Sequence, residues 1–176
     1  MIVVKIIGAV LILVSGYMFG KHIKDDMTNR SDVIFYINKA LAYIENKIVI
    51  ENAYLEDILA QCQPEIYKEK KIPQPFTLTC KKMTEENENI VDAWQKALEV
   101  MFMENDYIKD EEKEYMYQVG VCLYLPDKTR QSQGLRTIID NLGPVAKKVE
   151  EKAKKDGKMA LQISMICAIL LIILII

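Results

Sequence analysis

Hydrophobic residues form two long runs, one near each end of the chain. Residues 2–20 read "IVVKIIGAVLILVSGYMFG", with Lys5 as their one charge, and residues 159–176 read "MALQISMICAILLIILII". As helices rising about 1.5 Å per residue, both runs roughly match a hydrocarbon core of about 30 Å. The pattern predicts transmembrane helices at residues 2–20 and 159–176. It also places the central segment, residues 21–158, on one side of the membrane.

A cleaved signal peptide is a competing interpretation of the first run, because Lys5 resembles a charged n-region. The apolar residues continue through "GYMFG", however, without a clear small-x-small cleavage site. We therefore expect this run to stay as a membrane helix.

Apolar residues of the central segment recur at three- and four-residue steps, which is typical of amphipathic helices. This spacing predicts helices over residues 33–48, 55–59, 90–101, 115–123 and 135–153. Ser31 and Asn52 are candidate caps for the first two of these. No convincing strand pair occurs, so the sequence predicts an all-α bundle flanked by transmembrane helices.

Prolines interrupt this helical pattern at two places. Pro64, Pro73 and Pro75 lie in "QPEIYKEKKIPQPF" and indicate a connector after the second helix. Pro144 follows Gly143 inside the last helix, where it removes an amide donor and clashes with the preceding turn. We expect a kink or a helix restart there.

Positive charges flank both apolar runs on the side of the central segment. They are Lys21, Lys24, Arg30, Lys147, Lys148, Lys152, Lys154, Lys155 and Lys158. The positive-inside rule therefore predicts that residues 21–158 face the cytoplasm. The cysteines of this segment are scattered without disulfide-framework spacing, which agrees with a reducing compartment.

Composition and motifs give little support to nucleic-acid binding or catalysis. The formal net charge of −2 provides no broad basic face, so we expect no nucleic-acid partner. His22 is the only histidine, and no metal-ligand constellation surrounds it. The sequence has no GxxxxGK[ST] phosphate loop and no GxSxG motif. We expect a binding or scaffolding protein rather than an enzyme, with no catalytic residue, cofactor, metal or small-molecule substrate.

Five short motifs follow one another along nearly the whole chain. They are "GAVLILVSG" near the start, Arg30 with Leu41, Ile44, Glu45 and Ile48, "AWQKAL" from Ala93, "VG..L...D...Q" from Val119 to Gln131, and "GKM" before the final run. This ordered set resembles the stage III sporulation protein AB family. Where that family usually has Leu-Gly, this chain has Leu123 and Tyr124, which puts a glycine-dependent close approach in doubt.

The resemblance implies a subunit of the membrane complex that endospore-forming bacteria assemble between mother cell and engulfed forespore, on the mother-cell side. It implies a soluble domain similar to the F domain of type II secretion platform proteins, which is an all-helical bundle. The implied partners are a cytoplasmic secretion-type ATPase and other sporulation membrane proteins. Asp127, Gln131 and Arg30 fall on the family's motifs and become candidate partner-binding residues. For Asp127, a helix N-cap is the favoured alternative.

Small residues occur four apart in both apolar runs. Gly16 and Gly20 belong to the first run, and Ser164 and Ala168 belong to the second. Such pairs allow two helix backbones to approach closely, which makes these four residues candidates for helix packing, within one molecule or with a partner. Lipid-exposed small residues without a packing role are the alternative.

Three function classes remain open. A platform subunit that docks an ATPase is favoured, a small pore or transporter subunit is second, and a membrane-bound enzyme of unrecognised type is third. Neither residues 6–19 nor residues 159–176 contain an ionisable side chain apart from tyrosine and cysteine. Polar pathways through a membrane usually need such groups, which counts against the pore.

Overall fold

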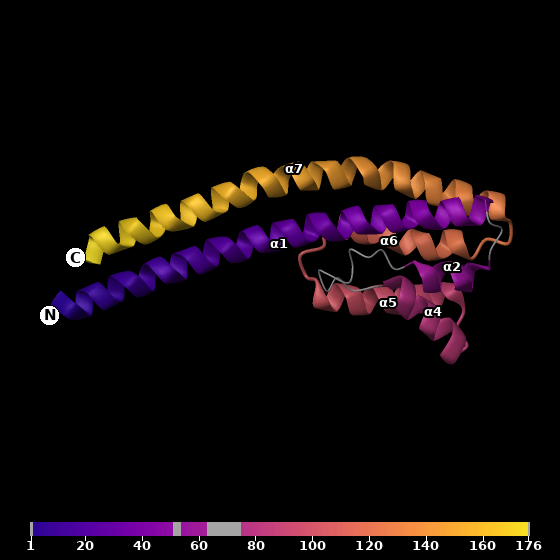
Figure 1. Ribbon diagram of the computed structural model, residues 1–176, viewed down its shortest axis with the longest axis horizontal. Coiled ribbons are helices and arrows are strands. Elements are labelled where there is room, and N and C mark those ends of the chain that lie inside the picture. The colour runs from indigo at the N-terminus through magenta and orange to yellow at the C-terminus, as the bar shows by residue number, and fades with distance from the viewer. Residues whose placement is uncertain (1, 51–53, 63–74, 176) are drawn as a thin grey trace. The chain divides into compact units, whose positions relative to one another are not determined.

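The computed structural model describes residues 2–50, 54–62 and 75–175, and every regular element within them is a helix (Figure 1). The helices are α1 (Ile2–Ile50), α2 (Leu55–Gln61), α4 (Pro75–Glu85), α5 (Ile90–Glu104), α6 (Asp110–Leu123) and α7 (Lys128–Ile175). The predicted all-α class is confirmed, because the described residues contain no strand.

The chain divides into two compact units. The first unit consists of Met1–Asp32 and Lys147–Ile176, and the second consists of Val33–Ala146. Both α1 and α7 contribute to both units. The sequence analysis predicted that the membrane-spanning segments end at residue 20 and begin again after residue 158. These limits describe where the chain would leave a bilayer, and they stay predictions.

The second unit is a bundle that encloses an apolar core. In it α2 packs on α4, α4 on α5, and α5 on α6. Each helix turns its apolar stripe inward, which removes that stripe from water and provides the main driving force for folding. The largest fully buried side chains are Trp94, Phe76, Ile34, Ile37, Leu41, Ile44, Leu59, Leu98, Met101, Met116 and Leu123.

Polar side chains organise the turn from α4 to α5. Asn87 adopts a left-handed backbone conformation, with φ at 55°, which asparagine tolerates better than most residues. Asn89 then caps α5, because its side-chain oxygen accepts the backbone N–H of Asp92 at 3.0 Å. The backbone conformation of Asn87 and the capping hydrogen bond of Asn89 therefore define this turn.

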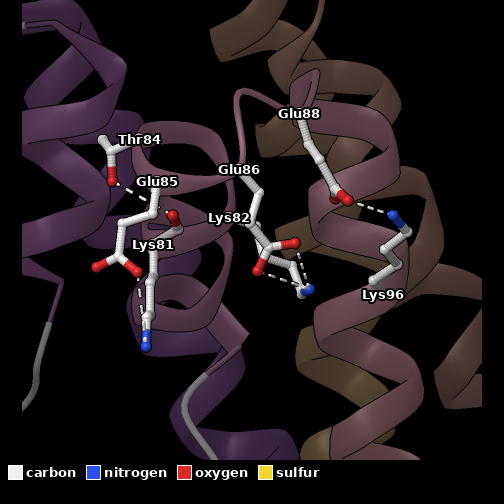
Figure 2. Close-up of polar contacts among 7 residues, drawn as sticks. All are labelled: Lys81, Lys82, Thr84, Glu85, Glu86, Glu88 and Lys96. Atoms are coloured by element: carbon white, nitrogen blue, oxygen red, sulfur yellow. Dashed lines mark hydrogen bonds and ion pairs between the residues drawn. The ribbon is translucent and has the colours of Figure 1, made fainter.

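Ion pairs surround the same turn (Figure 2). Lys81 pairs with Glu85 at 3.7 Å, and Lys82 pairs with Glu86, the residue after α4, at 3.3 Å. The two residues of each pair are four positions apart in the sequence, which is about one helical turn. Lys96 on α5 pairs with Glu88. One partner of each pair is at least half exposed, so water screens these pairs and they contribute little to the stability of the fold.

The predicted cap at Ser31 is wrong. Ser31 lies inside α1, which runs without interruption from Ile2 to Ile50, and its side chain is buried. Serine is a good cap only where a helix begins, and residues 21–32 contain no glycine or proline that would end the preceding helix. Asn52, the other candidate cap, lies outside the described residues, and the helix after it is confirmed as α2.

The prediction at Pro75 is also wrong, and the prediction at Pro144 is wrong in part. Pro75 and Phe76 open α4 instead of ending a connector, since a proline fits the first helical turn, where its missing amide is not needed. The buried Thr79 hydroxyl donates to the Pro75 carbonyl at 2.6 Å. Pro144 does not restart a helix, because α7 continues through it, whereas a kink there stays a prediction. Pro64 and Pro73 lie outside the described residues.

Candidate helix-packing seam and partner-binding residues

The first unit is built from the apolar ends of α1 and α7. Each of these helices contains a stretch that is long and apolar enough to cross a membrane. Most large apolar side chains there are exposed, including Phe19 at 64% and Leu174 at 84%. Water would penalise such surfaces, whereas lipid chains would cover them.

Small residues bring the two helices together within this unit. A Cβ atom added to Gly16 would lie 2.7 Å from the Ala168 Cβ and 3.2 Å from the Ser164 carbonyl oxygen. One added to Gly20 would lie 2.9 Å from the Leu161 Cα and 3.0 Å from the Ser164 Cβ. The structure thus places all four sequence-predicted packing residues at one contact, which we call the glycine seam (Gly16, Gly20, Ser164 and Ala168).

The contact continues beyond the glycine seam at a position that the sequence analysis missed. A Cβ atom on Gly157 would lie 3.1 Å from the Lys24 Cγ, so the aliphatic stem of a lysine packs on this glycine. Gly157 precedes Ser164 by seven residues and therefore falls on the same helical face. The seven-residue spacing from Ser164 could have identified Gly157 as a packing residue from the sequence. Its charged neighbours, which are not typical of a packing face between helices, made that spacing easy to miss.

An apolar groove of about 540 Å³ follows the same contact between α1 and α7. Its lining residues are Leu11, Ile12, Ser15, Gly16, Phe19, Ile163, Ser164, Cys167, Ala168 and Leu171. None of these side chains is charged, so the groove suits hydrocarbon rather than an ion or a polar solute.

Asp127 and Gln131 lie together at the turn from α6 to α7. The Asp127 carboxylate accepts the backbone N–H of Thr129 at 3.3 Å. The backbone carbonyl of Asp127 accepts the backbone N–H of Gln131 at 2.9 Å. Asp127 therefore sits at the start of α7 with the geometry of an N-cap.

The side chain of Gln131 closes the same turn. Its Nε2 donates to the carbonyl oxygens of Leu123 at 2.9 Å and Leu125 at 2.7 Å. Carbonyls at the end of α6 would otherwise lack partners. Gln131 is half-buried, whereas Tyr124, the residue that stands where a glycine was expected, is 65% exposed and makes no close approach that needs glycine.

Arg30 lies half-buried on α1 in the first unit, whereas Asp127 and Gln131 belong to the second. A partner role for any of the three stays a prediction.

Trp94 and Gly120 give two further motifs a structural role. The Trp94 indole Nε1 donates to the Met116 carbonyl at 2.7 Å, and its ring lies 5.1 Å from that of Phe76. A Cβ atom on Gly120 would lie 2.8 Å from the Trp94 Cδ1, so the absence of a side chain there lets α6 approach the indole. The motifs "AWQKAL" and "VG" thus meet at one core contact.

No group of three metal ligands comes together within residues 5–50, 54–62 and 75–174. Those residues contain no cluster of three histidine, cysteine or acidic side chains that could hold a metal. His22 is exposed and lies 3.6 Å from Asp26, one turn along α1. Burial raises the pKa of the Cys62 thiol to about 12, which makes it a poor nucleophile.

Comparison with known proteins matches the chain to one family. The family described as stage III sporulation protein AB matches residues 5–176, almost the entire length. The chain belongs to the stage III sporulation protein AB family. No curated protein and no solved structure matches significantly. The resemblance noted in the sequence is confirmed, and with it a place in sporulation.

Membership of the stage III sporulation protein AB family gives the motifs a common interpretation. Trp94, Gly120, Asp127 and Gln131 all contact other parts of the second unit, through one core contact and one turn. The motifs around Trp94, Gly120 and Gln131 therefore help to build the bundle of the second unit. Two helices of membrane-spanning length fit a membrane protein of that family.

Proposed function

We propose that this protein is a non-enzymatic platform subunit of a secretion-like complex in endospore formation. In this proposal it is held in the mother-cell membrane facing the forespore, and its second unit lies in the cytoplasm. That unit docks a secretion-type ATPase, and the paired apolar helices anchor the dock. The likeness to the F domain of type II secretion platforms belongs to the same proposal.

One observation carries the proposal. The motif side chains of the second unit are engaged in forming its core and its α6–α7 turn, where Gln131 donates to two carbonyls. Enzymes instead hold reactive groups in a cleft with perturbed pKa values. The motif residues of this bundle stabilise its fold instead. A stable bundle of this kind is suited to presenting a surface to other proteins.

The arrangement of the first unit supports anchoring. The glycine seam holds two apolar helices at backbone contact, which would make a compact pair of membrane helices. The groove beside it has no ionisable lining that would favour ion passage. A pore or transporter therefore receives no support from the described residues.

Co-purification from sporulating cells tests the proposal. The full chain with an affinity tag, solubilised from membranes, is expected to retain a nucleotide-hydrolysing partner, and a tagged unrelated two-span protein serves as control. The full chain purified on its own is expected to hydrolyse no ATP. Hydrolysis that survives repeated purification would contradict the non-enzymatic half, and loss of every sporulation partner would contradict the platform half.

A further inference from the structure

The apolar groove beside the glycine seam has about the length of one membrane leaflet. It extends from Leu11 to Phe19 on α1 and from Leu171 to Ile163 on α7. Eight residues of helix rise about 12 Å, whereas one leaflet contributes about 15 Å to a hydrocarbon core of about 30 Å. Phe19 and Ile163 lie close to the predicted ends of the two spans, at residues 20 and 159. The groove therefore matches an extended acyl chain of the leaflet on that side.

The lining of the groove also suits an acyl chain. Its volume of about 540 Å³ falls within the roughly 300–1,000 Å³ of typical ligand sites, and no lining side chain is charged. Ser15, Gly16 and Ser164 leave room, because their side chains are small or absent. Leu11 and Phe19 form apolar walls that stay 62% and 64% exposed. A hydrocarbon chain in the groove would cover these walls.

Acidic side chains continue the two groove faces beyond the predicted spans. Asp26 follows Phe19 by seven residues and Asp156 precedes Ile163 by seven, so each lies on the helix face that lines the groove. The rise from the predicted span ends is about 9 Å to Asp26 and about 5 Å to Asp156. The headgroup layer of a bilayer is about 5–8 Å thick on each side of the hydrocarbon core. Both carboxylates are therefore within reach of a lipid headgroup.

Two N–H donors lie on the same faces. His22 follows Ser15 by seven residues, and its Nε2 lies 3.6 Å from the Asp26 carboxylate. Lys152 precedes Asp156 by four residues, which is one helical turn. The headgroup side of the groove thus combines two carboxylates with an imidazole and an ammonium group.

The lysines nearest to the spans lie on other faces. A helix turns by about 100° per residue, so Lys21 and Lys24 are about 200° and about 140° around α1 from Phe19. Lys158 is about 140° around α7 from Ile163 for the same reason. The side of the first unit that carries the groove is therefore not simply cationic, and an anionic headgroup alone does not match it.

We propose that the groove binds one acyl chain of a phospholipid whose headgroup carries a primary ammonium, such as phosphatidylethanolamine. Asp26 and Asp156 accept hydrogen bonds from the ammonium, and His22 and Lys152 donate to the phosphate. Charge-assisted hydrogen bonds of this kind are stronger than neutral ones. A choline headgroup has no N–H to donate and is typically recognised by aromatic cages, and a glycerol headgroup has no cation. Neither of them satisfies the two carboxylates.

A lipid at this site has a structural consequence. Its chain contacts α1 and α7 at once, and such dispersion contacts are what hold helices together in a membrane. Because the lipid binds the folded chain, it should raise the melting temperature of the protein. The proposal goes beyond the platform function and does not depend on the docking of an ATPase.

Native mass spectrometry of the full chain in detergent tests the site. The protein is mixed with phosphatidylethanolamine, phosphatidylcholine or phosphatidylglycerol of identical acyl chains. We expect one retained phosphatidylethanolamine per chain, and about tenfold less retention of the other two lipids, as the loss of a charged hydrogen bond implies. Phosphoethanolamine without acyl chains should not be retained, because the groove supplies the contacts to the chain.

Asparagine substitutions test the headgroup contacts. Asp26→Asn with Asp156→Asn should lower the retention of phosphatidylethanolamine about tenfold and leave the other two lipids unchanged. Asp25→Asn with Glu151→Gln is the matched control, because both residues are exposed and lie on other faces of the same helices. Circular dichroism in lipid-free detergent should give equal melting temperatures for both double variants, which separates loss of the lipid from unfolding.

Leucine substitutions test the contacts to the chain. Ser15→Leu with Cys167→Leu places two larger side chains in the groove and should lower the retention of phosphatidylethanolamine strongly. Val14→Leu with Ile166→Leu is the matched control, because these exposed residues do not line the groove. It should retain the lipid as the unchanged chain does.

Three results would overturn the proposal. Equal retention of the three phospholipids would show that the ammonium is not recognised. Retention that survives Asp26→Asn with Asp156→Asn would place the lipid elsewhere. A lipid-free dimer that dissociates in the Ser15→Leu, Cys167→Leu variant would show that a second copy fills the groove instead.

Discussion

Gln131 shows how a motif residue can act on structure at the scale of one side chain. Its amide nitrogen holds the carbonyls of Leu123 and Leu125, and Asp127 at the same turn caps α7. The sequence pointed to both positions and favoured an N-cap for Asp127, but it gave no turn contact for Gln131. The contacts within residues 123–131 come from the structure, and a partner role for either residue stays a prediction.

Removing the Gln131 amide should destabilise the α6–α7 turn. Gln131→Ala leaves two carbonyls without their donor, and we expect a loss of about 1–3 kcal/mol in the free energy of unfolding. Thermal unfolding of the purified full chain in detergent, followed by circular dichroism, measures it. Gln133→Ala, at an exposed position nearby, is the control and should change little. Equal effects of the two substitutions would contradict a turn-closing role.

The stability of the protein should decrease at alkaline pH because of Cys62. Burial raises the pKa of its thiol to about 12, whereas an unfolded cysteine ionises near about pH 8.5. The contribution of Cys62 to stability is therefore fully present below about pH 8.5. It is lost as the pH rises toward 12, by about 1.4 kcal/mol per pH unit, because only the unfolded state releases its proton.

Alkylation of a variant that keeps Cys62 as its only cysteine measures this shift. The folded full chain should react with iodoacetamide very slowly at pH 8, and faster as the pH rises through the range in which circular dichroism still shows it folded. The same chain unfolded in SDS is the control and should react as an ordinary thiol. Rapid modification of the folded chain at pH 8 would show that Cys62 is accessible and that its pKa is not raised.

At the scale of elements, apolar periodicity predicted the long helices but not all of the helix ends. Helices α2, α5, α6 and α7 were predicted from their stripes, because burial of one face sets that pattern. Helix α4 was missed, because its prolines indicated a connector and its stripe of Phe76 and Thr79 is short. The continuity of α1 through Ser31 was missed as well, since a cap residue cannot be told from an ordinary helical serine without its neighbours in space.

The glycine seam was predictable for a different reason. Close approach of two helix backbones requires small residues at regular spacing, and Gly16, Gly20, Ser164 and Ala168 carry that signal directly. Which helix they would contact was not predictable, because a partner's helix would require the same residues. The register that sets Gly16 against Ala168 comes from the structure.

Filling the glycine seam should separate the two apolar helices. In the variant Gly16→Leu with Gly20→Leu, the new side chains meet atoms within 3 Å of their Cβ positions, so the helices must move apart. Overpacking of this kind costs about 1–3 kcal/mol per site, while leucine itself favours insertion into a bilayer. We expect a membrane-inserted chain that unfolds at lower temperature and fails in sporulation, measured by melting in detergent and by counts of heat-resistant spores.

Gly8→Leu is the matched control for the glycine seam. A Cβ atom on Gly8 would have no neighbour within 4 Å, so leucine there adds apolar surface without a clash. Normal melting and normal spore counts are expected for it. If the double variant behaved like Gly8→Leu, the apolar helices would be plain anchors.

At the scale of the whole molecule, topology decides whether a cytoplasmic ATPase could reach the second unit at all. Lysines flank both apolar runs on the side of the central segment, and the positive-inside rule predicts that this side faces the cytoplasm. Glu111 offers a test position, because it is exposed at the start of α6. Glu111→Cys in a chain without native cysteines should resist a membrane-impermeant maleimide added to intact cells and react after permeabilisation. Labelling of intact cells would place the bundle outside, where neither a cytoplasmic ATPase nor a reducing compartment is available, and would overturn the proposed platform in one measurement.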